Sequence, residues 1–199
     1  MNAFGIGSPE MLIKNGIILK GERLPDHGLI LMDTPGYGFR SRDSWGATIL
    51  KYLELRKALR GAIVLISAEK KVSEEDGWVL AKLAATDTRT TVVLTKADKL
   101  GNEWPVKCQS LAETLRDDMA SLSTDRWKEA NGWNPDVYAT AAGMSVSGKL
   151  GNGGGLGGVR MAVLEMAGYR LSEREVNTKP ENVSYEGDVV GFDDIQWKS

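Results

Sequence analysis

Short apolar runs alternate with segments of helical spacing along most of the chain. The runs that predict strands lie at 29–32, 62–67 and 91–95, with a weaker one at 136–140 and a further strand-like segment at the N-terminus, residues 1–7. Strands that are apolar on both faces and separated by helices are typical of a parallel sheet covered by helices. The pattern therefore predicts an α/β fold with a mostly parallel sheet flanked by helices.

Between these runs, apolar residues recur at helical spacing. The predicted helices span about 44–60, 73–85, 106–122 and 159–167. Ser44 is a candidate N-cap. The sequence from Ser73 opens the second helix, with acids in the first turn where the helix dipole favours negative charge. The glycine-rich stretch 151–158 predicts a flexible loop.

The pattern weakens toward the C-terminus. Residues 170–199 hold 4 basic and 7 acidic side chains and lack a convincing apolar period. We therefore divide the chain into one domain at 1–169 and an acidic C-terminal tail at 170–199.

Composition narrows the function classes. The chain has 199 residues and a net charge of -2, which argues against a strongly basic nucleic-acid-binding domain, and we expect no DNA partner. One cysteine, Cys108, and one histidine, His27, make a cysteine cage or a histidine relay improbable. No apolar stretch is long enough to span a bilayer, and no signal peptide is recognisable. The sequence leaves the localisation open, and the cysteine count is compatible with cytoplasm or mitochondrial matrix.

Candidate chemistry begins at the end of the first long apolar run, in the sequence Asp33-Thr34-Pro35-Gly36. An acid at the tip of a buried strand can hold Mg²⁺, directly or through water. A glycine three residues later lets a backbone N–H approach a terminal phosphate. Alone, this spacing is also that of an ordinary turn.

The third run ends in Thr95-Lys96-Ala97-Asp98. A carboxylate at Asp98 could accept hydrogen bonds from the N1–H and the exocyclic amine of guanine, a donor pair that adenine lacks. The aliphatic stem of Lys96 could cover the face of the base. A strand followed by a charged turn is the alternative interpretation.

The weaker strand ends in Thr140-Ala141, where a backbone N–H at Ala141 could donate to the guanine O6. Each of these segments is weak alone. Their order, each at the end of its own predicted strand, favours one ligand site, because parallel sheets bind ligands at the carboxyl ends of their strands.

In combination, these segments resemble the later sequence boxes of a GTPase. The run from Asp33 to Phe39, then Trp45-Gly46, Tyr52 to Arg56 and Leu94 to Leu100, is similar to the EngB (YihA) family, densely from about 4 to 101 and more weakly to about 167. The resemblance implies a P-loop GTPase-like fold, GTP or GDP with Mg²⁺ as ligands, and a link to ribosome assembly. It assigns Mg²⁺ to Asp33, phosphate to 33–36, and guanine to Thr95, Lys96, Asp98, Thr140 and Ala141.

The same resemblance implies that a phosphate loop is missing. A G domain of this type begins with a strand, a Gly-x-x-x-x-Gly-Lys-Ser/Thr loop and a helix, and no such motif precedes Asp33. The absent strand would be central in the sheet, so we expect unpaired strand edges and an apolar face beside it. Gly143 to Lys149 fits the first part of the motif, but Leu150 replaces the hydroxyl, and an inserted loop is the better interpretation.

Two functions follow as hypotheses. The first is a GTP-binding protein of the EngB type, whose GTPase activity is left uncertain by the missing loop. Its loop at Tyr37, Phe39, Arg40 and Arg42 could contact rRNA or a ribosomal subunit. The second is a non-enzymatic, degenerate G domain (a pseudo-GTPase) that acts as an interaction module for the ribosome or a protein.

Overall fold

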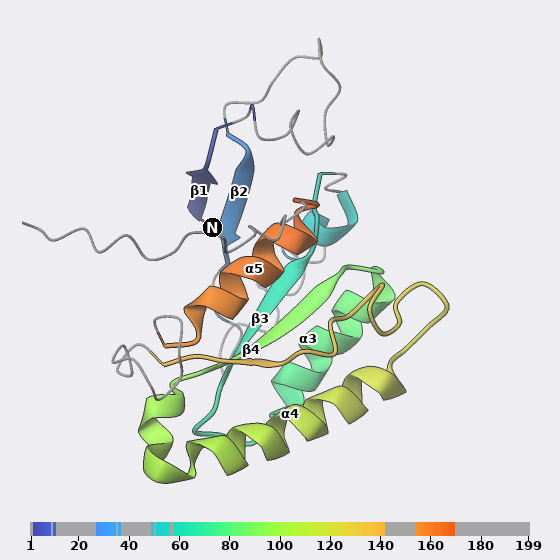
Figure 1. Cartoon of the computed structure of the whole chain (residues 1–199). Helices are drawn as coiled ribbons and strands as arrows, with labels where there is room; N and C mark the ends of the chain where they lie inside the picture. Colours follow the sequence, from blue (N-terminus) through green and yellow to red (C-terminus); the bar gives the residue numbers. More distant parts are fainter. Residues whose placement is uncertain are drawn as a thin grey trace, which may run out of the picture.

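The computed structural model describes residues 2–8, 10, 27–34, 36, 49, 51–55, 58–141 and 154–169. Within them the elements follow the order β1 (Asn2–Ile6), β2 (Leu29–Asp33), β3 (Ala62–Ser67), α3 (Glu74–Ala85), β4 (Thr90–Thr95), the 3₁₀ segment η1 (Ala97–Glu103), α4 (Trp104–Ser121), β5 (Tyr138–Ala139) and α5 (Leu156–Met166). Residues 51–55 are also helical. Figure 1 shows α3 and α4 on one side of the central strands and α5 on the other.

The central sheet is parallel and holds the core. Its strands lie in the order β3-β4-β5, with Ala62 opposite Thr90 and Leu94 opposite Ala139. Every residue of β4 except its last is buried, as expected of a strand covered on both faces. The core consists mainly of side chains from β3, β4, α3 and α4. The predicted α/β class with a parallel sheet is confirmed.

Helix α3 begins where the sequence predicts. The Ser73 hydroxyl accepts from the Asp76 amide at 3.2 Å, and the Ser73 amide donates to the Asp76 carboxylate at 2.8 Å. This reciprocal capping box satisfies amides that the helix itself leaves unpaired. It fixes the point at which the chain leaves β3 and turns back across the sheet.

A loop after α4 closes the core with two tryptophans. Trp127 is fully buried, and its indole N–H donates to the Thr88 carbonyl at 2.8 Å. Its ring centroid lies 6.4 Å from that of Trp133, which donates in turn to the Ser123 hydroxyl at 2.9 Å. The loop is thereby tied to the start of β4.

The N-terminal strands form a separate sheet. β1 and β2 pair antiparallel, with Asn2 opposite Asp33 and Ile6 opposite Leu29, so they make a two-stranded sheet of their own. The Tyr169 hydroxyl, just after α5, donates to the Gly28 carbonyl at 2.6 Å. Ala167 and Tyr169 pack with Leu29 in a small apolar cluster that joins this sheet to α5.

Where the structure describes them, most element predictions hold with shifted bounds. Of the helix predicted over 44–60, residues 49 and 51–55 are helical and 58–60 are not, and Ser44 lies outside the described residues. The weak strand predicted at 136–140 is only Tyr138–Ala139, and the last helix begins at Leu156, inside the stretch predicted as a flexible loop. Gly155 stands against β5, where a Cβ would meet the Ala139 carbonyl oxygen, so the glycines there allow a close approach. Residues 170–199 and 143–149 lie outside the described residues.

Candidate functional site

The residues predicted to face guanine lie on two neighbouring strands. β4 ends at Thr95 and runs directly into Lys96 and Asp98, and the parallel strand β5 ends beside it before Thr140 and Ala141. The amide of Ala97 donates to the Thr140 carbonyl at 3.1 Å, so the two strand ends are hydrogen-bonded to each other. The structure therefore brings this part of the predicted site together.

Lys96 adopts a left-handed backbone conformation, with φ of 61° and ψ of 33°. For a residue with a Cβ this conformation costs about 1–2 kcal/mol. It turns the chain sharply from β4 into η1, and the Lys96 ammonium lies 3.7 Å from the Glu69 carboxylate, just after β3. Glu69 was not predicted; its place two residues beyond the β3 strand end is the signal that could have found it.

Asp98 is half-buried in the first turn of η1. Among the described residues, none makes an ion pair or a hydrogen bond with its carboxylate. Thr95, by contrast, donates from its hydroxyl to the Ile66 carbonyl at 3.3 Å and joins β4 to β3. Thr95 thus supports the strand end, and Asp98 keeps both carboxylate oxygens available.

Thr140 and Ala141 are both buried, and both donate hydrogen bonds within the protein. The Thr140 amide and hydroxyl donate to the Leu94 carbonyl at 2.7 and 3.1 Å. The Ala141 amide donates to the Gly154 carbonyl at 3.0 Å. In this conformation the Ala141 N–H already has an acceptor, so donating to a ligand would require the segment at Gly154 to move.

The residues predicted to face phosphate and Mg²⁺ lie on the other sheet. Asp33 is the last residue of β2 and is exposed. The side-chain amide nitrogen of Asn2 lies 3.5 Å from one of its carboxylate oxygens. Thr34 and Gly36 follow it, and Pro35 lies outside the described residues. Because Mg²⁺ commonly takes one or two carboxylates and completes its shell with water and phosphate oxygens, an exposed Asp33 fits it as a single protein ligand. No group of three His, Cys, Asp or Glu side chains gathers as a metal site among the described residues.

A large groove lies between β2 and β3. Its volume is about 730 Å³, and its walls come from β2, β3, α3 and α5. Exposed apolar side chains of the kind expected from the resemblance occur here, because Ile30 on β2 lines the groove and is 56% exposed. We refer to this cavity between β2 and β3 as the interstrand groove.

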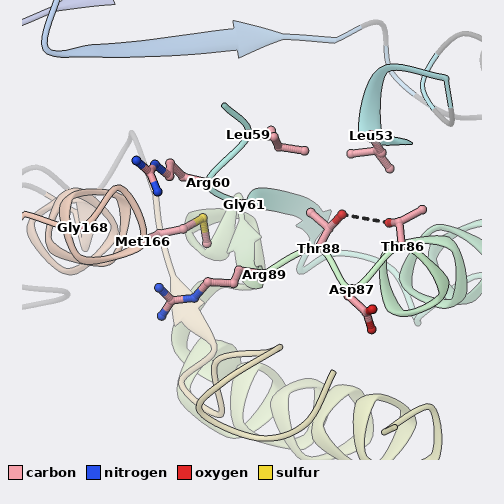
Figure 2. A pocket seen from close by; sticks show the side chains of 10 residues that line it. All are labelled: Leu53, Leu59, Arg60, Gly61, Thr86, Asp87, Thr88, Arg89, Met166 and Gly168. Atoms are coloured by element: carbon pink, nitrogen blue, oxygen red, sulfur yellow. Dashed lines mark hydrogen bonds between the residues drawn. The ribbon is translucent and has the colours of Figure 1, made fainter. Parts of the chain in front are cut away.

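A second cavity lies at the opposite end of the parallel sheet. It measures about 430 Å³ and is lined by residues at the starts of β3 and β4, among them Arg60, Gly61 and Arg89 (Figure 2). Its Asp87 is 3.6 Å from Arg126 in an ion pair. Ligands of parallel sheets bind at the carboxyl ends of strands, so its position does not favour it as the ligand site.

The chain is similar to GTP-binding proteins. It is 34% identical over 96 residues to the probable GTP-binding protein EngB of Listeria monocytogenes serotype 4a (strain HCC23), covering 45% of this chain and 50% of that protein. It is also 34% identical over 104 residues to that of Geobacter metallireducens, covering 48% and 51%. The resemblance drawn from the motifs is thereby confirmed, and the chain spans about half the length of the curated relatives it matches.

The apo form of translation elongation factor SelB from Methanococcus maripaludis superposes with a TM-score of 0.47 and 17% identity, covering 80% of this chain and 29% of that one. No family model matches the chain. Within the described residues, no helix is both long and apolar enough to cross a membrane.

Proposed function

We propose that this chain binds guanine nucleotides, with Asp98 selecting the base. The observation that carries the proposal is the half-buried Asp98 carboxylate, which lacks a described partner at the end of a strand buried on both faces. The similarity to proteins named as GTP-binding supports the same ligand.

Base selection follows from hydrogen-bonding chemistry. A carboxylate accepts hydrogen bonds and donates none, so it complements the N1–H and exocyclic amine of guanine. Lys96 leaves β4 beside Asp98, and its ion pair with Glu69 holds the stem where it can cover a base. Because hydrogen bonds to charged groups contribute about 1.5–3 kcal/mol, Asp98 alone can favour guanine over adenine by roughly 10–100-fold.

The test is to exchange the acceptor for a donor. Asp98→Asn places an amide where the carboxylate stood, so GTP should bind roughly 10–100-fold more weakly, while XTP, whose base has a carbonyl in place of the amine, should gain affinity. Asp117→Asn, a change to an exposed acid on α4, is the matched control and should leave both affinities unchanged. An Asp98→Asn chain that still prefers GTP to XTP contradicts the proposed role.

We extend the proposal to Mg²⁺ and phosphate through Asp33, Thr34, Pro35 and Gly36. What supports it is the position of Asp33 at a strand tip, with an exposed carboxylate. Mg²⁺ would supply charge neutralisation for the phosphates, and Asp33 would orient it. Asp33→Ala should then abolish any effect of Mg²⁺ on nucleotide affinity, and an unchanged Mg²⁺ dependence would rule Asp33 out.

We also propose a role in ribosome assembly, which rests on the resemblance to the EngB family. Its candidate contact, the segment holding Tyr37, Phe39, Arg40 and Arg42, lies outside the described residues. Cosedimentation with ribosomal subunits at increasing salt tests it, since contacts to phosphates weaken as salt rises. If the amount of chain that sediments with the subunits changes neither with nucleotide nor with salt, the result counts against this role.

The interstrand groove favours a second candidate, the pseudo-GTPase that serves as an interaction module. A large apolar groove is a feature of binding surfaces rather than of an isolated stable domain. A folded chain that binds a protein partner but no guanine nucleotide would establish this candidate over the first.

A further inference from the structure

The cavity of about 430 Å³ at the starts of β3 and β4 carries two arginines that are not paired. We refer to it as the arginine cavity. Both side chains, Arg60 and Arg89, are exposed, and among the described residues neither makes an ion pair or a hydrogen bond. Figure 2 shows both guanidinium groups extending toward the end of the cavity at Met166 and Gly168. This end of the cavity therefore presents two uncompensated positive charges.

The remaining lining of the arginine cavity does not neutralise these charges. Asp87 is the one acid among the described residues that line it, and its carboxylate lies 3.6 Å from the Arg126 guanidinium in an ion pair. Much of the rest of the lining is apolar, with side chains from Leu53, Leu59 and Met166. An occupant that combines carboxylates with apolar side chains would complement both kinds of surface. An inorganic anion would pair with the arginines but leave the apolar lining uncovered.

The end of α5 directs the chain past the arginine cavity. Gly168 has a φ of 90°, its amide donates to the Glu165 carbonyl at 2.9 Å, and the Tyr169 amide donates to the Leu164 carbonyl at 2.9 Å. This is a Schellman motif, which fixes the direction in which a chain leaves a helix. Tyr169 is buried and donates from its hydroxyl to Gly28 at 2.6 Å. Because Gly168 lines the cavity, residues 170–199 start at its rim.

The segment 181–197 in that tail has the composition that the cavity requires. It holds five acids and no lysine, arginine or histidine, since the basic residues of 170–199 all lie outside it. The acids are Glu181, Glu186, Asp188, Asp193 and Asp194, and they alternate with apolar residues that include Val189, Val190, Phe192, Ile195 and Trp197. Arginine pairs well with such carboxylates, because its planar guanidinium can donate two parallel hydrogen bonds.

The short connection between the cavity and this segment favours a contact within one molecule. Residues 170–180, 11 in number, join Tyr169 to the segment. A flexible linker of that length has an r.m.s. span of about 17–20 Å. Short linkers give effective concentrations in the millimolar range. A contact that would be too weak between separate molecules can therefore form within this chain.

We propose that the acidic segment 181–197 of this chain binds in its own arginine cavity. Its carboxylates pair with Arg60 and Arg89, and its apolar side chains pack against Leu53, Leu59 and Met166. Both contributions are needed, because an exposed ion pair alone contributes no more than about 1 kcal/mol. The inference does not depend on nucleotide binding, since the cavity lies at the opposite end of the sheet from Asp98, so either can fail without the other.

A nitroxide spin label on the segment tests the contact in the full-length chain. Ser184→Cys carries the label in a Cys108→Ala background, and NMR records how strongly it broadens each backbone amide. At low salt we expect strong broadening at Gly61 and Arg89, beside the cavity, and little at Ala97, at the other end of the sheet. A mixture of spin-labelled unenriched chain with unlabelled ¹⁵N-enriched chain should show no such broadening.

Charge reversal distinguishes a docked segment from one that is only tethered nearby. Arg60→Glu with Arg89→Glu should reduce the broadening at Gly61 at least about threefold, because two ion pairs become like-charge contacts. Lys70→Glu with Lys71→Glu makes the same change of charge at exposed residues beyond the end of β3, and should leave the broadening unchanged. Adding Asp193→Arg and Asp194→Arg to the arginine variant should restore it.

Three results would overturn the proposal. The first is broadening at Gly61 that is no stronger than at Ala97, or that arises only between molecules. The second is broadening that survives the reversal of both arginines or falls equally in the lysine control. The third is a failure of the reversed segment to restore the contact, which would show that its carboxylates do not meet Arg60 and Arg89.

Discussion

The two sheets of this protein differ in what holds them. The parallel sheet β3-β4-β5 lies within the core, and every residue of β4 except the last is buried. In the antiparallel pair β1-β2, every residue is exposed or half-buried, and Phe4 and Ile30 are more than half exposed. Since buried apolar area is the main source of stability, the first sheet is fixed by packing and the second by few contacts.

The candidate site is divided along the same line. Lys96, Asp98 and Thr140 follow the ends of β4 and β5 in the parallel sheet. Asp33 ends β2 of the antiparallel pair, and Gly36 follows it. The part proposed to face the base is therefore supported by a buried sheet, and the part proposed to face phosphate is not. The following predictions test this contrast.

The largest expected effect on stability is in the core around the parallel sheet. Trp127→Ala removes a fully buried ring and its hydrogen bond to Thr88, so it should lower the free energy of unfolding by about 3–5 kcal/mol. Urea denaturation followed by circular dichroism measures this. A loss below about 1 kcal/mol would mean that this loop is not part of the core.

A middle-sized effect is expected at the contact between the two sheets. Tyr169→Phe removes the hydroxyl that donates to Gly28, which should cost about 0.5–1.5 kcal/mol and speed hydrogen exchange in β1 and β2 more than in β4. Equal acceleration in both sheets would show that this bond does not hold the antiparallel pair specifically.

The same tyrosine gives a pH dependence. Burial raises the pKa of Tyr169 above its ordinary value of about 10, so its folded pKa exceeds its unfolded one. Its contribution is therefore fully present below the unfolded pKa and is lost as pH rises through the folded value. In the Tyr169→Phe chain the stability difference from the parent should shrink above about pH 10, as measured by urea denaturation. A constant difference would contradict this assignment.

A smaller effect separates stability from binding at Lys96. Lys96→Gly relieves the left-handed conformation but adds freedom to the unfolded chain, so stability should change by less than about 1 kcal/mol. Nucleotide affinity should nevertheless fall, because the side-chain stem that we propose covers the base is gone. Lys99→Gly, nearby in η1 but without positive φ, is the control and should lower stability while sparing affinity. Unchanged affinity in Lys96→Gly would remove Lys96 from the site.

The smallest effect is expected on the antiparallel pair. Phe4→Ala truncates a side chain that is 55% exposed and should change the free energy of unfolding by no more than about 0.5 kcal/mol. Urea denaturation alongside Trp127→Ala makes the comparison direct. A large loss at Phe4 would show that this sheet is packed more firmly than its exposure implies.

The elements of the parallel sheet and its helices could be predicted well, because each is determined by residues within its own segment. The continuous apolar runs of β3 and β4 and the capping residues Ser73 and Asp76 each determine their own segment. Strand pairing between distant segments is less visible, so the separate β1-β2 sheet and the ion pair of Lys96 with Glu69 emerged only from the structure. The Ala141 amide donates to the carbonyl of Gly154, which lies in a run of glycines. Such a run does not indicate from sequence which of its residues will contact the sheet.

The central claim is that the base-facing part of the site is assembled in this chain. Its most direct test is the binding of fluorescent GDP to the purified 199-residue chain with Mg²⁺, with GTP and ATP as separate competitors. The account predicts displacement by GTP and GDP, and at least about tenfold weaker displacement by ATP, because Asp98 meets no donor pair on adenine. Equal displacement by ATP, or no binding by a chain that circular dichroism shows to be folded, would contradict it.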